Sequence, residues 1–352
     1  MITIQKYVRA QSLEEAWQLN QSRRNRILGG MLWLRLGNGT VNTAIDLCDL
    51  GLGAIAETET EFSIGAMATL RDLEQHEGLN AYTQGAIGNA VRDIVGVQFR
   101  NMATVGGSIW GRFGFSDVLT AFLALDSDVE LYKGGIVPLE EFAKRKKDRD
   151  ILVRLIVKKT PCRMVYTAMR NQRTDFPVIA CALCRMGGET RVSIGARPGR
   201  AMLLRTEEID PQALGDLAAK NIPTEGNLRG SAAYRTHLVR VLTQRAMTEL
   251  EEREYGNQTE TQRQGRHRLC RAGHGAAGLS ESPGLPQRQA GLRHLQLRPL
   301  YRHAGRKAHS LLLHPGGTGR GPRDLHIGGP TGGSRGLCRL HCRPGRRPVR
   351  LL

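Results

Sequence analysis

The feature that most restricts the fold of this chain is an abrupt change of composition near residue 254. All seven Phe and all three Trp residues precede that point, whereas eight of the ten His residues follow it. Residues 254–352 are rich in Arg, Gly, Pro and His and have no sustained hydrophobic periodicity. Such a segment cannot bury enough apolar surface to offset the entropy lost on ordering. We therefore expect residues 1–253 to form the folded body and residues 254–352 to be disordered.

The same boundary divides the charges. Residues 254–352 carry 18 Lys and Arg residues against four acidic ones, which accounts for +14 of the formal net charge of +18. A large positive charge suggests a nucleic-acid partner, but the body retains only +4. We expect no nucleic-acid partner for the body. A basic nucleic-acid-binding protein remains an alternative if the basic segment belongs to the natural protein.

The N-terminus and the cysteines indicate a cytoplasmic protein. The opening segment MITIQKYVRAQSLEEAWQL predicts an alternating strand and then an amphipathic helix capped by Ser12. It is not a secretory signal, and no apolar run is long enough to insert into a membrane. Seven cysteines without regular spacing fit a reducing compartment. Cys181 and Cys184 form a C-x-x-C inside an apolar run, and we expect them to be buried thiols rather than metal ligands or a redox pair.

The order of elements in the body predicts an α+β fold with two αβ lobes and a smaller third unit. We expect lobe 1 at residues 1–57, lobe 2 at 58–155 and a C-terminal domain at 156–253. The last of these contains three apolar strand-like runs, MVYTAMR, PVIACALCRM and TRVSIGARPGRAMLL, followed by a closing helix that starts near residue 231. A three-stranded sheet covered by helices is the expected arrangement.

Two Gly-Gly pairs stand out within the lobes, Gly29-Gly30 in RILGGMLWL and Gly106-Gly107 in RNMATVGGSIWG. Each follows a run that favours a strand, so we expect two strand-then-Gly-Gly turns. Backbone amides without side chains can bind an anion such as a phosphate. No G-x-G-x-x-G follows a strand, so a Rossmann nucleotide site is not indicated.

Eight motifs in one order resemble the FAD-binding subunit of the molybdenum hydroxylases, the enzymes related to xanthine dehydrogenase, carbon monoxide dehydrogenase and nicotinate dehydrogenase. They are ILGGMLWL, IDLCDLGL, FSIGAMATL, VGVQFRNMATVGGSI, SDVLTAFLALDSDVEL, RNQRTDFPVIACAL, VSIGARPGRA and RGSAAYRTHLVRVL. The resemblance covers about residues 1–250. It implies a two-lobed FAD-binding domain of the molybdopterin-dehydrogenase (PCMH-like) type, followed by the C-terminal domain.

The resemblance also implies the site. Both Gly-Gly segments would lie against the FAD pyrophosphate, with Asp117 near the cofactor and Arg170 near the ring system. No residue of this chain need act as an acid, base or nucleophile, so no catalytic or metal-binding residue is expected. The cofactor-binding residues expected by position are Leu28, Gly29, Gly30, Met31, Leu32, Thr104, Val105, Gly106, Gly107, Ser108, Asp117 and Arg170.

The implied role is electron transfer within a hetero-oligomer. A large subunit would hold the molybdenum cofactor and a small subunit two [2Fe–2S] clusters, while FAD on this chain passes electrons to NAD, oxygen or a quinone. A stand-alone flavoprotein oxidase is the main alternative, although neither Gly-Gly pair has a nearby His or Cys for covalent attachment. Met31 and Leu32 replace the polar residues usual in the family, and Ser108 replaces an Asn. Taken alone, Asp117 fits a helix N-cap as well as a cofactor contact, whereas Arg170 fits a solvated charge at a strand end better than a functional role.

The basic segment resembles a neighbouring gene translated out of frame. When permitted codons are shifted by one nucleotide, AGLRHLQLRPLYRHAGRKAHSLL can spell RGCGICNCGRCTVMLDGKPIHSC, which resembles the C-x4-C-x2-C cluster loop of the iron-sulfur subunit. Several other stretches follow in the same frame, and the apparent start codon spans Tyr255 and Gly256. DNA sequence across codons 245–265 tests this hypothesis. It also implies that Cys338, His341 and Cys342 are not metal ligands.

Overall fold

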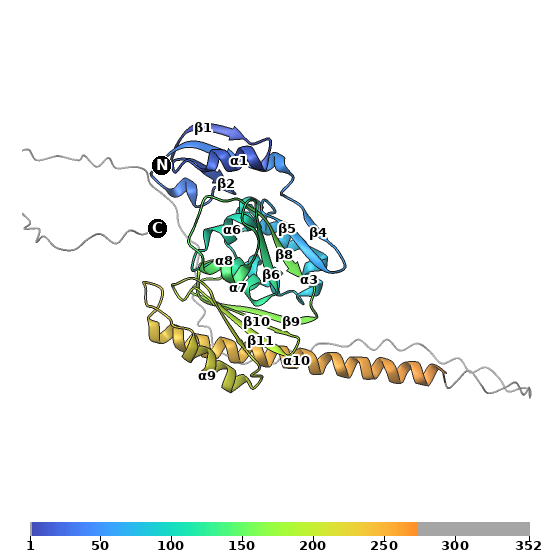
Figure 1. Ribbon diagram of the computed structural model, residues 1–352. Helices are drawn as coiled ribbons and strands as arrows, with labels where there is room; N and C mark the ends of the chain where they lie inside the picture. The colour runs from blue at the N-terminus through green and yellow to red at the C-terminus, as the bar shows by residue number, and fades with distance from the viewer. Residues whose placement is uncertain (1, 273–352) are drawn as a thin grey trace, which may run out of the picture. The chain divides into compact units, whose positions relative to one another are not determined.

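The computed structural model describes residues 2–272, with side chains for residues 2–253. Three sheets follow one another along the body (Figure 1), each with its own helices. The expected α+β fold is therefore confirmed. Of the segment proposed to be out of frame, 254–352, residues 273–352 lie outside the described residues.

Lobe 1 is a small parallel sheet with one helix. The strand order is β1-β3-β2, and both outer strands pair with β3 in parallel. The helix begins after Ser12, whose side chain accepts a hydrogen bond from the amide of Glu15 at 3.1 Å, as the sequence predicts. The elements are β1 (Thr3–Arg9), α1 (Leu13–Asn20), β2 (Arg26–Leu28), a short 3-10 helix (Leu34–Leu36), β3 (Thr40–Asp46) and a second 3-10 helix (Cys48–Leu50).

Lobe 2 is an antiparallel five-stranded sheet, ordered β4-β5-β8-β6-β7, with seven described helices. The strands are β4 (Ile55–Glu57), β5 (Glu61–Gly65), β6 (Ser127–Leu131), β7 (Gly135–Pro138) and β8 (Leu152–Lys158). The helices are α2 (Leu70–Gln75), α3 (Glu77–Tyr82), α4 (Ala86–Arg92), α5 (Val97–Met102), α6 (Val105–Gly111), α7 (Asp117–Ala124) and α8 (Leu139–Lys144). Because β4 and β8 both pair within this sheet, it extends slightly beyond the expected limits of 58 and 155.

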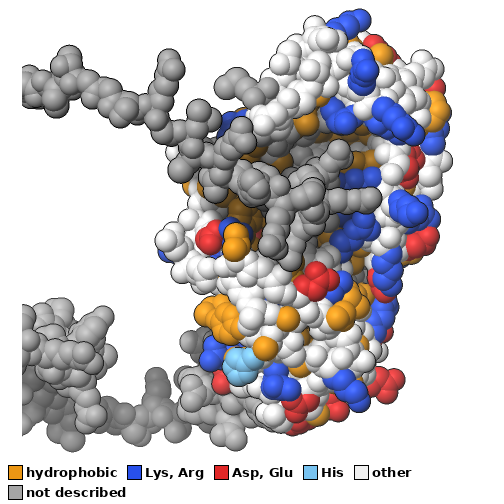
Figure 2. Space-filling model, turned by 90° about the vertical axis from the view of Figure 1, so that its left-hand side faces the viewer, with side chains coloured by type: hydrophobic (Ala, Val, Ile, Leu, Met, Phe, Trp, Pro, Cys, Tyr) orange, Lys and Arg blue, Asp and Glu red, His pale blue; other side chains and the backbone are white. Residues whose placement is uncertain are grey.

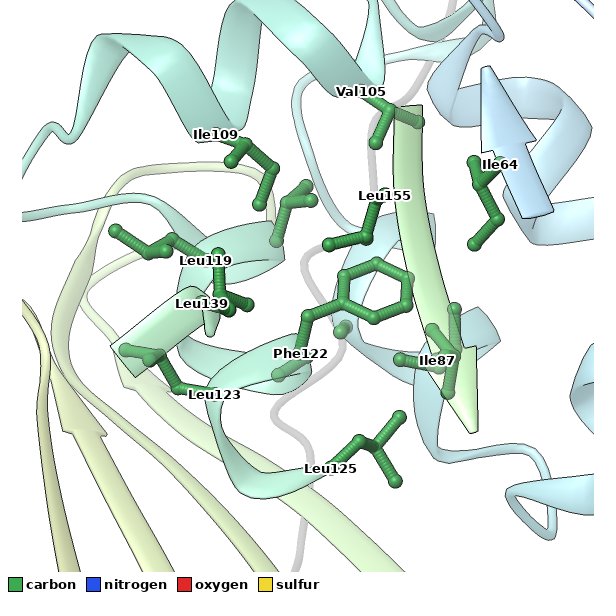
Figure 3. Packing of buried hydrophobic residues seen from close by; sticks show 14 of the residues in the cluster. Ile64, Ile87, Val105, Ile109, Leu119, Phe122, Leu123, Leu125, Leu139 and Leu155 are labelled. Carbon is green, nitrogen blue, oxygen red and sulfur yellow. The ribbon is translucent and has the colours of Figure 1, made fainter. Parts of the chain in front are cut away.

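The core of lobe 2 fixes the orientation of α6. Val105 and Ile109, four residues apart, lie on one face of α6 and are fully buried. They pack in the same cluster as Phe122 of α7 and Leu155 of β8 (Figure 3). Burying that face against the core leaves Gly107, between them in sequence, exposed on the opposite side.

The C-terminal domain differs from the expected three-stranded sheet by one strand. The run expected as a single strand from Thr190 is interrupted at Ala196, which adopts a left-handed φ of 59°, and by the following Pro-Gly turn. The result is an antiparallel meander ordered β12-β11-β10-β9. Its elements are β9 (Cys162–Arg170), β10 (Pro177–Met186), β11 (Glu189–Gly195), β12 (Met202–Thr206), α9 (Pro211–Asn221) and α10 (Ala232–Ala272).

Strand β10 is the centre of this domain because both of its faces are buried. Cys181 packs toward α9 and α10, whereas Cys184, an odd number of residues away, packs toward lobe 2. The two thiols therefore lie on opposite faces of the sheet and cannot pair, which confirms the expectation of buried thiols. Helix α10 continues through 254–272, beyond the expected end of the folded body.

Candidate functional site

The first Gly-Gly segment is a loop that follows β2. A Cβ built on Gly30 would lie 1.8 Å from the carbonyl oxygen of Met102, at the end of α5. Only glycine allows the two backbones to approach this closely. The next residue, Met31, has a left-handed φ of 57°, which is rare for a residue with a side chain.

The amides of this loop are available to a ligand. Gly29, Gly30 and Met31 donate no amide hydrogen bond to the part of the chain that the structure describes. When a residue in a loop adopts the left-handed conformation, the amides around it can point to the same side. Such amides form a concavity that binds anions. This segment therefore has the donors that the sequence predicts for an anion.

The second Gly-Gly segment is not the expected strand and turn. Thr104 caps α6, and its hydroxyl accepts a hydrogen bond from the amide of Gly107 at 3.1 Å. The amide of Val105 donates to Ala68, and that of Gly106 donates to Ala66, each at 2.8 Å. The amides expected to bind an anion are thus already bonded within the protein.

The two segments nevertheless meet, as the sequence predicts. A Cβ built on Gly29 would lie 2.8 Å from the hydroxyl oxygen of Thr104 and 3.7 Å from the Cα of Gly107. Both segments border one cavity of about 450 Å³, to which Leu28 also contributes. This volume lies within the range of small-molecule sites in proteins.

The rest of the cavity wall combines apolar and basic residues. Some of the lining residues belong to lobe 1, and others lie at the start of strand β8 in lobe 2. The cavity therefore lies between the two lobes. Among the described residues, no His or Cys lines it. The other main lining residues are Arg26, Ile27, Met67, Trp110, Lys147, Arg149, Ile151 and Leu152. Basic side chains gather along one edge of the face of the molecule that Figure 2 shows.

The side chains of three expected site residues are buried or already hydrogen-bonded within the protein. The side chains of Leu32 and Val105 are buried in the lobe 2 core, so neither can present a side chain to a ligand. Ser108 is half-buried, and its hydroxyl donates to the carbonyl of Thr104 at 3.0 Å. None of these three expected residues is among those that line the cavity.

Asp117 and Arg170 lie together, but they bind each other. The guanidinium of Arg170 contacts the carboxylate of Asp117 at 2.9 Å, with both side chains buried. The hydroxyl of Tyr166 donates to the same carboxylate, and Arg170 also donates to the carbonyl of Asp175 at 2.7 Å. Ser116 rather than Asp117 is the N-cap of α7. The two alternatives considered for these residues, an N-cap and a solvated charge, are therefore both wrong.

Burial dominates the electrostatics of this group. Desolvation raises the pKa of the Asp117 carboxyl above its ordinary value, although Arg170 and Tyr166 counteract the shift. Desolvation and the nearby carboxylate raise the pKa of Tyr166 well above 10, so its hydroxyl stays protonated as a donor. The cluster joins α7 of lobe 2 to β9 of the C-terminal domain.

Sequence analysis missed a cluster of four aromatic rings beside these groups. Trp33 lies three residues after Gly30 and contacts Phe113, Phe115 and Phe176, with ring centroids 5.4–6.1 Å apart. The rings of Phe113 and Phe115 stack at 5.2 Å with an angle of 7°. Trp33 remains 41% exposed. The signal in the sequence was the position of these aromatics, each within a few residues of a site motif.

Among residues 2–253, no group of His, Cys, Asp and Glu side chains is arranged to hold a metal ion. The described helices include none with the length and apolar character needed to cross a membrane.

Comparisons with known proteins agree with this geometry. Residues 2–159 match the family described as the FAD binding domain in molybdopterin dehydrogenase. The chain is 27% identical to the Escherichia coli K12 protein YgfM over 252 residues, which covers 68% of this chain and 93% of YgfM.

Two solved structures have the same fold. Carbon monoxide dehydrogenase from Oligotropha carboxidovorans matches with a TM-score of 0.64 and 22% identity, over 71% of this chain and 98% of that one. Quinoline 2-oxidoreductase from Pseudomonas putida 86 matches with a TM-score of 0.62 and 18% identity, over 70% and 96% respectively.

The loop amides, the glycine clearance and the cavity between the lobes suit a dinucleotide, whose pyrophosphate joins two bulky halves. Residues 2–159 belong to the FAD-binding domain family of the molybdopterin dehydrogenases, and the cofactor of this chain is FAD.

Proposed function

We propose that this chain is the FAD-carrying electron-transfer subunit of a molybdenum hydroxylase of the xanthine dehydrogenase type. The observation that carries the proposal is the contact between Gly29 and the Thr104–Gly107 segment at the mouth of the cavity. Bound there, FAD supplies the exchange of electrons between one-electron and two-electron partners.

The proposed binding mode places the pyrophosphate on the free amides of Gly29, Gly30 and Met31. Gly107 provides clearance on the opposite side because its exposed Cα carries no side chain. Leu28, Thr104 and Gly106 line the cavity beside these amides, whereas Leu32, Val105 and Ser108 would support the site through packing and hydrogen bonds within the protein. The rest of the cavity, with apolar residues such as Ile27 and Ile151, would receive the adenosine half.

The flavin half would then extend toward the aromatic cluster, defined here as Trp33, Phe113, Phe115 and Phe176. Both Gly-Gly segments run into this cluster, since Trp33 follows the first and Phe113 follows the second. Aromatic faces offset-stack readily with other flat rings. The buried Asp117–Arg170 pair would act as a positioning group, because it holds the segment carrying Phe115 against the strand that precedes Phe176.

The chain's partners follow from the same proposal. A small subunit with [2Fe–2S] clusters would deliver electrons from a molybdenum-binding large subunit, and NAD, oxygen or a quinone would receive them. The partly exposed aromatic cluster is where we expect electrons to enter or leave, because electron exchange requires the ring to lie near a surface. We propose a cytoplasmic hetero-oligomer.

The test is reconstitution of the full chain with FAD. We expect purified protein to show visible flavin absorption bands and to compete for FAD with ADP, which shares the adenosine and pyrophosphate groups. Replacing Gly107 with Leu should abolish binding, while the same change at exposed Gly39, which has open space around it, should not. Failure of the full chain to bind FAD under these conditions would contradict the proposal.

A further inference from the structure

The observed hydrogen bonds leave a shortage of charge at the proposed pyrophosphate site. A pyrophosphate diester carries two negative charges. The amides of Val105 and Gly106 are bonded to Ala68 and Ala66, and that of Gly107 to Thr104, so of the two Gly-Gly segments only the first has amides without a partner among the described residues. Buried or half-buried anions are stabilised mainly by charged partners or by several hydrogen bonds. A cationic side chain near this site would therefore supply the positive charge that the neutral amides lack.

Three basic residues line the cavity, and two of them have structural roles. The guanidinium of Arg149 donates to the carbonyl of Ser22 at 2.9 Å and also to those of Asn20 and Asn25. Arg26 donates to the carbonyls of Arg23 and Asn25. These contacts hold the two guanidinium groups on the backbone of the α1–β2 loop. Their donors are therefore already used in the protein and are not directed at a ligand.

Lys147 is different. It makes no ion pair and no side-chain hydrogen bond with the described part of the chain, although it lines the same cavity as Gly29 and Gly107. Its ammonium nitrogen lies 5.4 Å from the centre of the Phe113 ring. Lys147 thus borders both the cavity and the aromatic cluster, between the places proposed for the two halves of the dinucleotide.

Besides burial, the charges that shift the pKa of Lys147 downward are those of two arginines, Arg112 and Arg200. The guanidinium of Arg112 is buried without a hydrogen-bond partner in the described part of the chain and lies 3.9 Å from the Phe142 ring centre. Partial burial is the main cause that lowers the pKa of Lys147, and repulsion from the positive charges of Arg112 and Arg200 lowers it further. The carboxylates of Asp148 and Asp150 also line the cavity and accept backbone amides, and their two negative charges oppose only part of the positive charge there. An anion beside Lys147 would relieve this excess of positive charge.

We propose that Lys147 forms an ion pair with the FAD pyrophosphate and supplies the charge that the second Gly-Gly segment does not. The inference rests on the proposed function, because it takes FAD as the ligand of the cavity. Lys147 is in this view a binding residue that neither the motifs nor their spacing identify. The role of Lys147 is inferred from its position beside the cavity and the Phe113 ring, and not from the residues next to it in sequence.

The experiment compares Lys147→Gln with Lys146→Gln in the full chain. Lys146 is exposed and does not line the cavity, so it controls for the loss of one positive charge. FAD affinity is measured by flavin fluorescence titration at low and high salt, and riboflavin, which lacks phosphate, serves as the second ligand. We expect Lys147→Gln to weaken FAD binding about tenfold or more, the effect of losing a charge-assisted hydrogen bond. We also expect a flatter salt dependence and less than about twofold change for riboflavin.

Lys147→Arg should retain FAD affinity within a few-fold, because a cation remains at the site. The inference is overturned if Lys147→Gln and Lys146→Gln bind FAD alike, or if Lys147→Gln weakens riboflavin as strongly as FAD. A wild-type chain that binds no FAD would instead contradict the proposed function. A thermal unfolding curve identifies a variant that fails to fold, and the Arg variant then decides the question.

Discussion

The two Gly-Gly segments have the same residues in sequence but different structures. Gly29-Gly30 lies in a loop, and its amides are free of described partners. Gly106-Gly107 lies in the first turn of α6, where amides bond to Ala66 and to the Thr104 side chain. The comparison teaches that the first segment can donate to an anion, whereas the second mainly provides clearance beside it.

The steric roles of the glycines differ in the same way. A Cβ on Gly30 would overlap backbone atoms of Met102, which cannot move without shifting α5. A Cβ on Gly107 would meet only the Thr104 hydroxyl, at 3.0 Å. The fold itself therefore requires glycine at position 30, whereas we propose that the absence of a side chain at Gly107 serves the bound cofactor.

The largest expected effect comes from Gly30→Ala. The new methyl group would lie 1.8 Å from the Met102 carbonyl oxygen, so we expect the free energy of unfolding to fall by about 3 kcal/mol. Denaturant unfolding of the full chain measures the change. Gly39→Ala, with nothing within 4 Å of the added carbon, is the control, and equal stability of the two variants would contradict the assignment.

Gly107→Ala should separate binding from folding. Alanine favours a helix over glycine by about 1 kcal/mol, which offsets the close contact with Thr104, so the unfolding free energy should change little. The added methyl projects from an exposed position that borders the cavity, and we expect FAD affinity to fall about tenfold. Titration with FAD and denaturant unfolding check the two halves of this prediction. A loss of stability without a loss of affinity would reverse the roles we assign.

Thr104→Ala should have a smaller effect, through the start of α6. Removing the cap leaves the Gly107 amide without its hydroxyl acceptor, and loss of an N-cap costs about 1 kcal/mol. Thr104→Ser keeps the acceptor and should restore most of the stability. Thermal unfolding of the two variants side by side tests whether the hydroxyl, rather than the methyl group, fixes the segment.

The smallest effect concerns the joint between the lobes that carry the two segments. Glu14 of lobe 1 contacts Lys133 at 2.6 Å and accepts from Tyr132 at 2.8 Å, and these bonds lower the pKa of the Glu14 carboxyl to about 2. Because the folded pKa lies below the ordinary value of 4.5, the contribution to stability is present above about pH 4.5 and is lost as the pH falls toward 2. The pair is exposed, so its effect should be small.

Glu14→Gln should therefore lower stability slightly at pH 7 and have less effect near pH 3. Denaturant unfolding at both pH values measures the difference. In a Lys133→Met background, most of this pH dependence should disappear. Persistence of the full difference in that background would show that Lys133 is not its main source.

The sequence predicted local structure well where one physical requirement dominated. Ser12 caps α1 as expected by accepting the amide of Glu15, and the apolar run from Pro177 to Met186 forms a strand buried on both faces. The third run of the C-terminal domain was wrongly expected to be continuous. A left-handed residue at Ala196 starts a turn there, and alanine gives no signal for that conformation.

The candidate site was predicted in outline, and its chemistry only in part. The motif order correctly placed Gly29 near Gly107, but it gave both segments the same role. The strand propensity of Thr104 and Val105 was overridden because Val105 is buried when α6 packs on the lobe 2 core. The aromatic cluster and Lys147 come from separate segments and have no shared motif.

Composition, periodicity and glycine content are local properties, so the residues alone predicted the α+β class and the two glycine pairs, and the order of the motifs indicated the family. Which amides remain free, that Asp117 and Arg170 bind each other, and that Lys147 borders the glycine-lined cavity were seen only in the folded structure. These depend on which distant backbone carbonyls and charges approach each group. Hydrogen bonding and charge compensation are satisfied by neighbours in space, and spacing along the chain does not specify them.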